Sequence, residues 1–227
     1  MTAIPVPEAE TRPLRGLFGG TFDPVHLGHL ALARSARDAF ALDRVDFIPC
    51  HHPVHRGQPG ASPEQRRRML ELALQGEPGF VVNSVELDRD RPSWAVETLE
   101  QLRAGDPQSI FCWLMGADAW GGFERWREPE RILELAHIVV CARPGVARAV
   151  TRFDERFLGA GESLRSSPAG RVAWHAMPPN DCASTQVRAR LMAGEAPADC
   201  LPGPVLEFIQ RQGLYRAAPQ PTDPSRA

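Results

Sequence analysis

The sequence predicts an α/β protein with a Rossmann-like, doubly wound and mostly parallel sheet that has helices on both faces. Three observations support this fold class. Short apolar runs alternate along the chain with longer segments whose apolar residues recur at helical spacing, which is the pattern of βαβ crossovers. The 227 residues are enough to bury a core without disulfides or metal. The 43% hydrophobic and 24% charged residues are typical of a globular domain.

Four strands and three helices are expected in the first half of the chain. Residues 14–18 form a short apolar run that the pair Gly19-Gly20 ends, and residues 26–40 follow with apolar side chains at helical spacing. Residues 62–65 have the spacing of a capping box with proline at the first helical position, so a helix begins there and ends at Gly76. The other expected elements are strands at 45–49, 80–87 and 110–115, and a helix that Ser93 caps and Gly105 ends.

The second half continues the alternation and then ends in helices. We expect a helix at 128–135, strands at 138–141 and 172–176, and helices near 184–193 and 204–212. Residues 146–168 have no clear period and receive no assignment. Residues 1–13 and 217–227 are rich in proline and poor in apolar side chains, so they predict two disordered tails around one domain of residues 14–216.

The charged residues exclude several kinds of protein. With 26 basic and 28 acidic residues the formal charge is −2, which does not favour a partner such as nucleic acid or an anionic membrane. The chain has no lysine, which excludes both a Walker A loop and a Schiff-base enzyme. If the protein handles phosphates, it must therefore use arginine, histidine and backbone N–H groups.

Cysteine usage and the N-terminus bear on location. The five cysteines have no CxxC pair, which suits neither a disulfide framework nor a zinc site, so we expect free thiols and no bound metal. They are Cys50, Cys112, Cys141, Cys182 and Cys200. Free thiols are typical of a reducing compartment, and the chain shows neither a signal-peptide pattern nor an apolar run of membrane-spanning length. These observations predict a cytoplasmic protein without a membrane partner.

The turn after the first strand is expected to carry the chemistry. A doubly wound sheet binds ligands at the carboxyl ends of its strands, and residues 19–29 lie at the first of these ends. The glycine pair allows the backbone to approach a ligand and expose its N–H groups. His26 and His29 are three residues apart on one face of the first helical turn, and Gly28 keeps that surface open. With the helix N-terminus, these groups predict a phosphate site.

Two other interpretations of the histidines stay open at this point. They could be ordinary residues of a helix N-terminus, or they could bind a metal together with Asp23. Neither interpretation explains the two glycines, and a metal site would need a further ligand at fixed spacing.

Residues 19–29 resemble the GGTFDPxHxGH signature of bacterial nicotinate mononucleotide adenylyltransferases, in the HxGH nucleotidyltransferase superfamily. The resemblance continues over residues 14–216. It implies an enzyme of NAD biosynthesis that joins ATP and nicotinate mononucleotide to give nicotinate adenine dinucleotide and pyrophosphate. In this reaction the 5′-phosphate attacks the α-phosphorus of ATP in line, so positioning and charge stabilisation take the place of a protein nucleophile. Mg²⁺ is expected to arrive with ATP.

The resemblance also implies an ATP site. Residues 183–188 resemble the SSTxIR motif, in which Ser184 and Thr185 cap a helix that faces the phosphates and Arg188 pairs with a phosphate oxygen. His26, His29 and Arg188 are the expected catalytic residues, with the histidines on the bridging and α-phosphate oxygens and the arginine on the leaving pyrophosphate. The other residues expected at ATP are Gly19, Gly20, Thr21, Phe22, Gly28, Gly116 and Asp118. Asp118, from a GxD motif, could also cap a helix.

A second group of residues is implied at the mononucleotide. Residues 49–56 are similar to the family's loop that ends in Pro-His-Lys/Arg, which gives His55 and Arg56 a contact with the mononucleotide or the triphosphate. Trp126 occupies the position of a tryptophan that stacks on the nicotinate ring, where a flat aromatic face suits a flat pyridine. The other residues implied here are Ser93, Trp94 and Arg143, and Arg127 is expected beside them on the separate ground given below.

Three positions depart from the family pattern. Ala183 stands where a serine is usual, which removes one hydroxyl from the ATP end. Ala95 replaces a threonine that lies beside the substrate's carboxylate in relatives, and Arg127 stands where an aromatic residue is more usual. One hypothesis is that Arg127 supplies the missing contact with the carboxylate.

Other functions stay open as alternatives. The acceptor could be nicotinamide mononucleotide or another phosphorylated compound such as phosphopantetheine, although Trp126 and Arg143 favour a pyridine nucleotide. A non-catalytic nucleotide sensor could share the fold, which the intact His26, His29 and Arg188 disfavour. Nucleic-acid binding finds little support in a net charge of −2. A homo-oligomer is left open.

Overall fold

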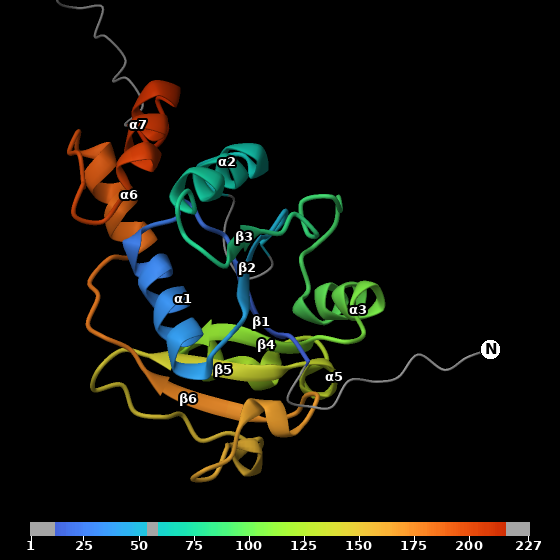
Figure 1. Cartoon of the computed structure of the whole chain (residues 1–227). Helices are drawn as coiled ribbons and strands as arrows, with labels where there is room; N and C mark the ends of the chain where they lie inside the picture. Colours follow the sequence, from blue (N-terminus) through green and yellow to red (C-terminus); the bar gives the residue numbers. More distant parts are fainter. Residues whose placement is uncertain (1–11, 54–58, 217–227) are drawn as a thin grey trace, which may run out of the picture.

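The computed structural model describes residues 12–53 and 59–216, and six strands in these ranges form one sheet in the order β3-β2-β1-β4-β5-β6 (Figure 1). All strand pairs in the described ranges are parallel. The strands are β1 (Leu14–Gly20), β2 (Arg44–Pro49), β3 (Phe80–Val82), β4 (Ile110–Gly116), β5 (His137–Ala142) and β6 (Val172–Ala176). The predicted doubly wound sheet is confirmed, and its strand order reverses between β1 and β4, where such sheets bind ligands.

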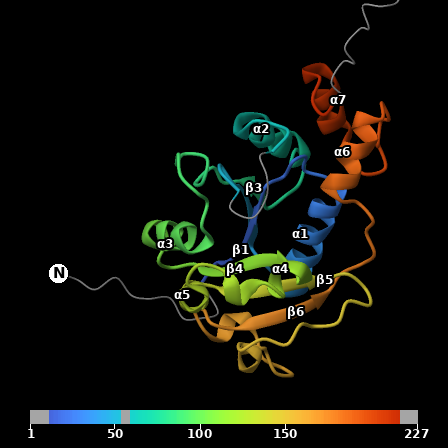
Figure 2. The same ribbon diagram turned by 180° about the vertical axis from the view of Figure 1, so that it is seen from behind.

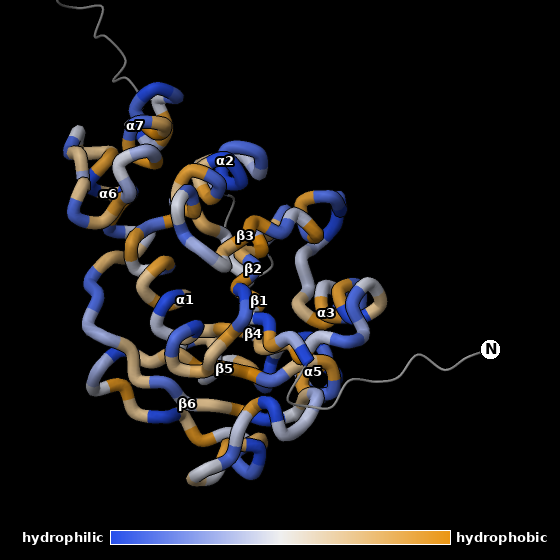
Figure 3. The backbone as a smooth tube through the Cα atoms, viewed as in Figure 1, coloured by the Kyte–Doolittle hydropathy of each residue, from blue (hydrophilic) through white to orange (hydrophobic). Residues whose placement is uncertain are grey.

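The strands are apolar on both faces because helices cover both faces. One face packs against α1 (Leu27–Phe40) and α2 (Pro63–Ala73), and the other against α3 (Ala95–Gly105), α4 (Ala117–Trp120) and α5 (Pro129–Leu135). Two further helices, α6 (Ser184–Met192) and α7 (Gly203–Gln212), join the core of the first face, and α7 packs against α2. Figure 2 shows α4 and α5 beside β4 and β5 on the second face. In β4, Leu114 belongs to the first core and Trp113 to the second, as the alternation of a strand requires. Figure 3 shows the mostly apolar β4 and β5 inside the molecule.

Local sequence signals place most helices and strands correctly. The capping box before α2 is present: Gln65 N donates to Ser62 Oγ (3.2 Å) and Ser62 N donates to Gln65 Oε1 (2.9 Å). The helix ends at Ala73, three residues before the expected stop at Gly76. The segment without an assignment contains two short 3₁₀ turns, η3 (Asp154–Arg156) and η4 (Leu164–Ser166).

Two predicted boundaries are wrong because side chains bond outside their own element. The third strand ends at Val82 instead of residue 87, since the Asn83 side chain donates to Asp46 (3.0 Å) and accepts from Val85 N (3.2 Å), which turns the chain away. Ser93 does not cap α3. Its Oγ accepts from His51 N (3.1 Å) and joins the loop after β2, while Trp94 takes the N-cap position.

The expected disorder of residues 1–13 is wrong for residues 12 and 13, the two residues of this tail that the structure describes. Arg12 Nε donates to Gln108 O (2.7 Å), and Pro13 O accepts from Ile110 N (2.7 Å) at the start of β4. Residues 12 and 13 therefore belong to the domain. The rest of the predicted tails, residues 1–11 and 217–227, lie outside the described residues.

The expectation of five free thiols is also wrong. Cys182 and Cys200 form a disulfide, with their Cα atoms 5.5 Å apart, whereas Cys50, Cys112 and Cys141 are free and buried. The paired cysteines are 18 residues apart, and α6 lies between them and brings the chain back. Their spacing matches no motif because the folded path of α6, and not a short local loop, brings them together.

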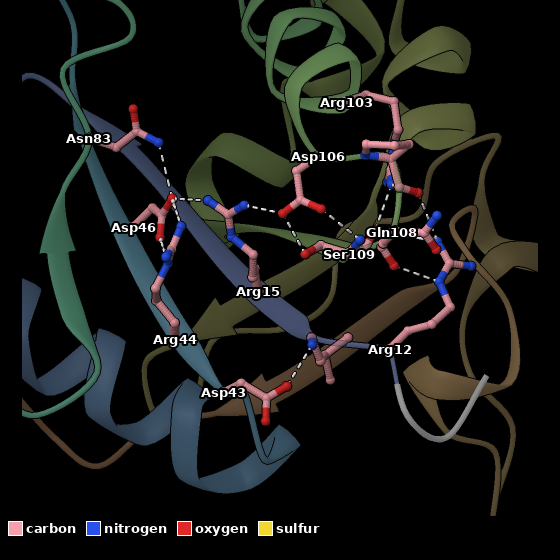
Figure 4. A network of polar contacts seen from close by, with 12 residues as sticks. Arg12, Arg15, Asp43, Arg44, Asp46, Asn83, Arg103, Asp106, Gln108 and Ser109 are labelled. Carbon is pink, nitrogen blue, oxygen red and sulfur yellow. Dashed lines mark hydrogen bonds and ion pairs between the residues drawn. The ribbon is translucent and has the colours of Figure 1, made fainter. Parts of the chain in front are cut away.

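A buried ion-pair network joins the central strands near their amino ends (Figure 4). Asp46 on β2 is completely buried and pairs with Arg15 on β1. It also accepts from Arg44 Nε (2.7 Å) and from Asn83 Nδ2 (3.0 Å). Arg15 pairs in addition with Asp106 (2.5 Å), in the loop before β4. The network thus ties β1 and β2 to each other, to Asp106 in the loop before β4 and to Asn83 directly after β3.

Candidate active site

A cleft of about 1300 Å³ opens at the carboxyl ends of β1 and β4, where the strand order reverses. This volume exceeds the roughly 300–1,000 Å³ of a site for one small ligand, so the cleft suits two. The predicted residues that line it are Gly19, Gly20, Thr21, Phe22, His29, Ser93, Trp94, Gly116, Asp118, Trp126, Arg127, Ser184 and Arg188. Within the described ranges, His26, Gly28, Arg143 and Thr185 do not line it. His55 and Arg56 lie outside the described residues.

The two histidines of the motif differ in exposure. His29 lines the cleft, whereas His26 is only 6% exposed and lies against it, with the ring centroids 3.7 Å apart. The expected place of both histidines in the first helical turn is therefore wrong for His26, while its contact with the ligand stays a prediction. The reason is local, since His26 is the N-cap of α1 with extended backbone angles and does not follow helical spacing.

Hydrogen bonding orients the His29 ring. The backbone N–H of His26 donates to His29 Nδ1 (3.2 Å), so the neutral ring carries its proton on Nε2. The Phe22 ring, itself buried, meets His29 edge-on with centroids 5.0 Å apart. His29 is thus held from two sides as a hydrogen-bond donor at the wall of the cleft.

Burial keeps His26 neutral. Burial, together with a smaller contribution from the positive charge of Arg143, lowers the pKa of His26 to about 4. His26 Nδ1 is buried and has no hydrogen-bond partner within the described ranges. At neutral pH, His26 is therefore an uncharged support for His29, and the exposed Arg143 lies close enough to affect its protonation.

Two glycines of the turn are required by the packing of the protein itself. A Cβ on Gly19 would lie 2.7 Å from Cζ2 of the Trp113 ring. A Cβ on Gly28 would lie 2.7 Å from Asn180 Oδ1, so the expected open surface at Gly28 is wrong because the segment before α6 covers it. Gly19 still lines the cleft.

Arg66 on α2 supports this site although it belongs to none of the sequence motifs. It is completely buried, its Nη1 donates to Thr21 O (2.8 Å) and its Nη2 to Cys50 O (2.7 Å). These bonds tie the turn after β1 to the end of β2. Within the described ranges no carboxylate pairs with this guanidinium, so its positive charge persists beneath the turn. The signal was present: Arg66 shares the buried stripe of α2 with Met69, Leu70 and Ala73.

Asp23 serves the protein and not a metal. It is 6% exposed and accepts from Gly60 N (2.8 Å), Ala61 N (3.1 Å) and the Tyr215 hydroxyl (2.6 Å). Arg188 supplies a fourth, positively charged neighbour, 3.8 Å from Oδ2. These partners occupy the carboxylate, so the metal interpretation of Asp23 and the histidines is wrong.

Helix α6 carries Arg188 to the cleft, but its start differs from the expectation. The N-cap is Ala183, so neither Ser184 nor Thr185 caps the helix. Ser184 Oγ donates instead to Pro24 O (3.2 Å), which fastens α6 to the turn after β1, and Thr185 is exposed. Asp118 likewise is not a cap, because Gly116 holds that position in α4.

Another part of the cleft is aromatic, and its two tryptophans are half-buried. Trp94 and Trp126 both line it, and Phe123 lies behind Trp126 with ring centroids 5.6 Å apart. The Arg127 guanidinium lies over the Trp94 ring at 5.6 Å, and its Nη1 pairs with Glu97 Oε1 (3.0 Å). Since the Arg127 side chain is 49% exposed, it lies at the mouth of this part.

Comparison with known proteins agrees with this architecture. A family model described as Cytidylyltransferase-like matches residues 17–190. The chain is 41% identical over 215 residues to a protein of Aeromonas hydrophila named "Probable nicotinate-nucleotide adenylyltransferase", covering 91% of this chain and 99% of that one. A protein of the same name from Marinobacter nauticus is 41% identical over 209 residues, covering 89% and 97%.

A solved structure shares the fold. It is described as "Plasmodium falciparum nicotinic acid mononucleotide adenylyltransferase complexed with NaAD" and matches with a TM-score of 0.68, covering 89% of this chain and 97% of that one. Because the sequence identity to this structure is only 14%, the match is evidence for the fold alone. The family model and the two sequence relatives carry the assignment further: the chain belongs to the cytidylyltransferase-like family and, within it, to the nicotinate-nucleotide adenylyltransferases.

Proposed function

We propose that this protein transfers the adenylyl group of ATP to nicotinate mononucleotide, giving nicotinate adenine dinucleotide and pyrophosphate. The observation that carries the proposal is a single cleft lined both by His29 and Arg188, whose helices belong to one core, and by Trp94 and Trp126, which pack against the other core. The first pair suits phosphates and the second suits a flat ring. The names of the sequence relatives support the same reaction.

Catalysis in this proposal rests on donors that meet the charge of the transition state. An oxygen of the mononucleotide 5′-phosphate attacks the α-phosphorus of ATP, and the bond from that phosphorus to the pyrophosphate oxygen breaks. His29 donates from Nε2 to an α-phosphate or bridging oxygen, and backbone N–H groups of residues 20–22 lie beside it. Arg188 stabilises the leaving pyrophosphate. In this proposal His26 acts through His29, because it is buried behind that ring.

We treat Mg²⁺ as part of the substrate MgATP. Of the carboxylates that line the described cleft, Asp23 is occupied by its protein partners and Glu86 is buried against Thr98 (2.6 Å). Burial raises the pKa of Glu86, which makes it a poorer cation ligand. Asp118 alone is exposed. One carboxylate together with ATP phosphates is the usual way in which proteins hold magnesium.

The remaining predicted contacts are divided between the two substrates as part of this proposal. Of the residues that line the cleft, Gly19, Gly20, Thr21, Phe22, Gly116, Asp118 and Ser184 would contact ATP, and Ser93, Trp94, Trp126 and Arg127 would contact the mononucleotide. Gly28 and Thr185 do not line the cleft, and their contacts with ATP stay predictions. Arg143 acts near His26, and the roles of His55 and Arg56 stay predictions.

A cytoplasmic location is part of the proposal because ATP and a mononucleotide are the substrates. No helix in the described ranges has both the length and the apolar character needed to cross a bilayer. The net charge of −2 offers nothing that would attract nucleic acid.

The test is pyrophosphate release from MgATP, with nicotinate and nicotinamide mononucleotides supplied separately. We expect turnover at least tenfold faster with the acid. Equal or faster turnover with the amide would mean that Ala95 and Arg127 have changed the specificity. Release with neither acceptor would contradict adenylyl transfer to pyridine mononucleotides and favour another acceptor or a nucleotide sensor.

A further inference from the structure

The buried Asp23 carboxylate joins four segments that are far apart in the sequence. Its own segment follows β1, Gly60 and Ala61 precede α2, Arg188 lies on α6, and Tyr215 follows α7. Figure 1 shows α2, α6 and α7 gathered beside the amino-terminal end of α1. A carboxylate removed from water is stable only when donors satisfy its oxygens. Here Oδ1 accepts two hydrogen bonds and Oδ2 accepts one, and the Arg188 guanidinium lies 3.8 Å from Oδ2.

Tyr215 reaches Asp23 because the chain turns sharply after α7. Gly213 ends the helix in the left-handed conformation with φ +63°, and Tyr215 itself has φ +57°. Its ring lies against Gly60, where an added Cβ would come within 3.0 Å of Cε1. Burial and the neighbouring Asp23 charge raise the pKa of the Tyr215 phenol, so the hydroxyl stays protonated and remains a donor.

Arg188 is held by one nitrogen and leaves the others unused. Its Nη1 donates to the Asp23 backbone carbonyl (2.6 Å) and is 3.8 Å from Asp23 Oδ2. Within the described ranges, Nε and Nη2 donate to no protein acceptor. The side chain is 30% exposed and lines the cleft, so these nitrogens are available to a ligand there.

We propose that Tyr215 is a positioning residue for Arg188 and acts through Asp23; this inference rests on the proposed function of the site. The Tyr215 hydroxyl and Ala61 N hold Oδ1, which directs Oδ2 toward Arg188. The Oδ2 charge, 3.8 Å from Nη1, acts together with the hydrogen bond to the Asp23 backbone carbonyl and fixes the guanidinium with its unused N–H groups toward the β- and γ-phosphates of ATP. Planar, charge-assisted donors of this kind bind phosphate oxygens strongly when their orientation is set in advance.

A positioning role and a purely structural role of Tyr215 predict different changes in the affinities for ATP and AMP. If Tyr215 acts through Arg188, its loss weakens binding of ATP, which has β- and γ-phosphates, but not of AMP, which lacks them. A purely structural contribution would weaken both ligands to the same degree.

The experiment measures Kd for MgATP and for AMP by calorimetry on the full chain, for the wild type and for Tyr215→Phe. We expect Tyr215→Phe to raise Kd for ATP about tenfold, as for a hydrogen bond to a charged group, and to leave Kd for AMP within about twofold. In an Arg188→Ala background, Tyr215→Phe should have no further effect on ATP. Arg190→Ala is the matched control, since Arg190 lies on the same helix, pairs with Glu195 and Asp199 and does not line the cleft.

Asp23→Asn is a second variant in case Tyr215→Phe fails to fold, and it should show the same selective loss of ATP affinity. Equal weakening of ATP and AMP, or a full effect of Tyr215→Phe in the Arg188→Ala background, would overturn the proposal. A wild type that binds ATP and responds selectively to Tyr215→Phe, but adenylylates no mononucleotide, would refute the proposed reaction while supporting this inference.

Discussion

Two buried aspartates, one near each end of the sheet, pair with arginines in different ways. At the amino end, Arg15 pairs with both Asp46 and Asp106, and Arg44 donates twice to Asp46 (2.7 and 3.3 Å), so the guanidinium groups are used within the protein. At the carboxyl end, Arg188 contacts Asp23 through one nitrogen and lines a cleft. An aspartate–arginine pair is thus purely structural at the amino end, whereas at the carboxyl end its arginine keeps N–H groups available for a ligand.

The largest effect is expected from Asp46→Ala, which tests the structural end. Removing Asp46 takes one of the two carboxylate partners from the buried Arg15 and the shared acceptor from Arg44 and Asn83. Breaking a buried pair in this way typically costs about 3–5 kcal/mol of unfolding free energy. Urea unfolding measures this loss, and kcat of the folded enzyme should stay within about twofold. Asp38→Ala is the control, because Asp38 pairs with Arg37 on the surface. A stability loss no larger than that of the control would show that the amino-end pair is not structural.

His29→Ala tests the open end and should leave stability nearly unchanged. Loss of a donor to the transition state typically lowers kcat by about 10²–10³-fold. The measurement is steady-state pyrophosphate release, with circular dichroism to confirm the fold. His175→Ala is a matched control, since His175 bonds to Ser35 (2.7 Å) and does not line the cleft. Unchanged kcat in a folded His29→Ala variant would remove His29 from the mechanism.

Each end of the sheet also buries one histidine, and these two histidines make the unfolding free energy depend on pH. Burial lowers the pKa of both His26 and His137 to about 4, from 6.5 when exposed. Between pH 6.5 and 4 the unfolded chain binds protons that the native state does not, so stability decreases as the pH falls through this window. At pH 5 the loss relative to pH 7 is about 2 kcal/mol for each histidine.

Urea unfolding of the wild type and of His137→Asn at pH 7 and pH 5 measures this contribution. The difference between the two pH values should shrink by about 2 kcal/mol in the variant, because one of the two histidines no longer titrates. An equal pH dependence in both proteins would mean that His137 is not the group responsible.

Trp126→Ala sharpens the contrast between the cleft residues that suit phosphates and those that suit a flat ring. Stacking of a base on an aromatic ring contributes about 1–3 kcal/mol, so KM for the mononucleotide should rise about tenfold or more while KM for ATP changes little. Trp174→Ala is the control, as Trp174 lies on β6 and does not line the cleft. An equal rise in both KM values would argue against a ring-stacking role.

The smallest effect is expected for Arg127→Ala. Arg127 is half exposed and already paired with Glu97, and exposed pairs of this kind contribute about 0–1 kcal/mol. If Arg127 contacts the substrate's carboxylate, KM for nicotinate mononucleotide should rise about twofold to fivefold, without a rise for the amide. Arg131→Ala, an exposed arginine paired with Glu100 and Glu134, controls for surface charge. The hypothesis fails if both mononucleotides respond equally.

Local signals in the sequence predicted the helices and strands well, and they erred where side chains bond across elements. The capping box at Ser62 is a local feature and was predicted correctly. Ser93 has an equally good local pattern but bonds to the loop after β2, and Asn83 ends its strand by reaching Asp46. The difference arises because a competing partner from another element is invisible in the local sequence.

The sequence by itself determined the fold class, the family and the place of the cleft, because hydrophobic periodicity and the 19–29 motif are contiguous signals. Only the tertiary structure decided which motif residues face the cleft, with His29 at its wall and His26 behind it. It also decided the Cys182–Cys200 disulfide and the bond between Asp23 and Tyr215, which are 192 residues apart. The physical reason is that burial and non-local pairing depend on how separate elements pack together, and no spacing along the chain encodes that packing.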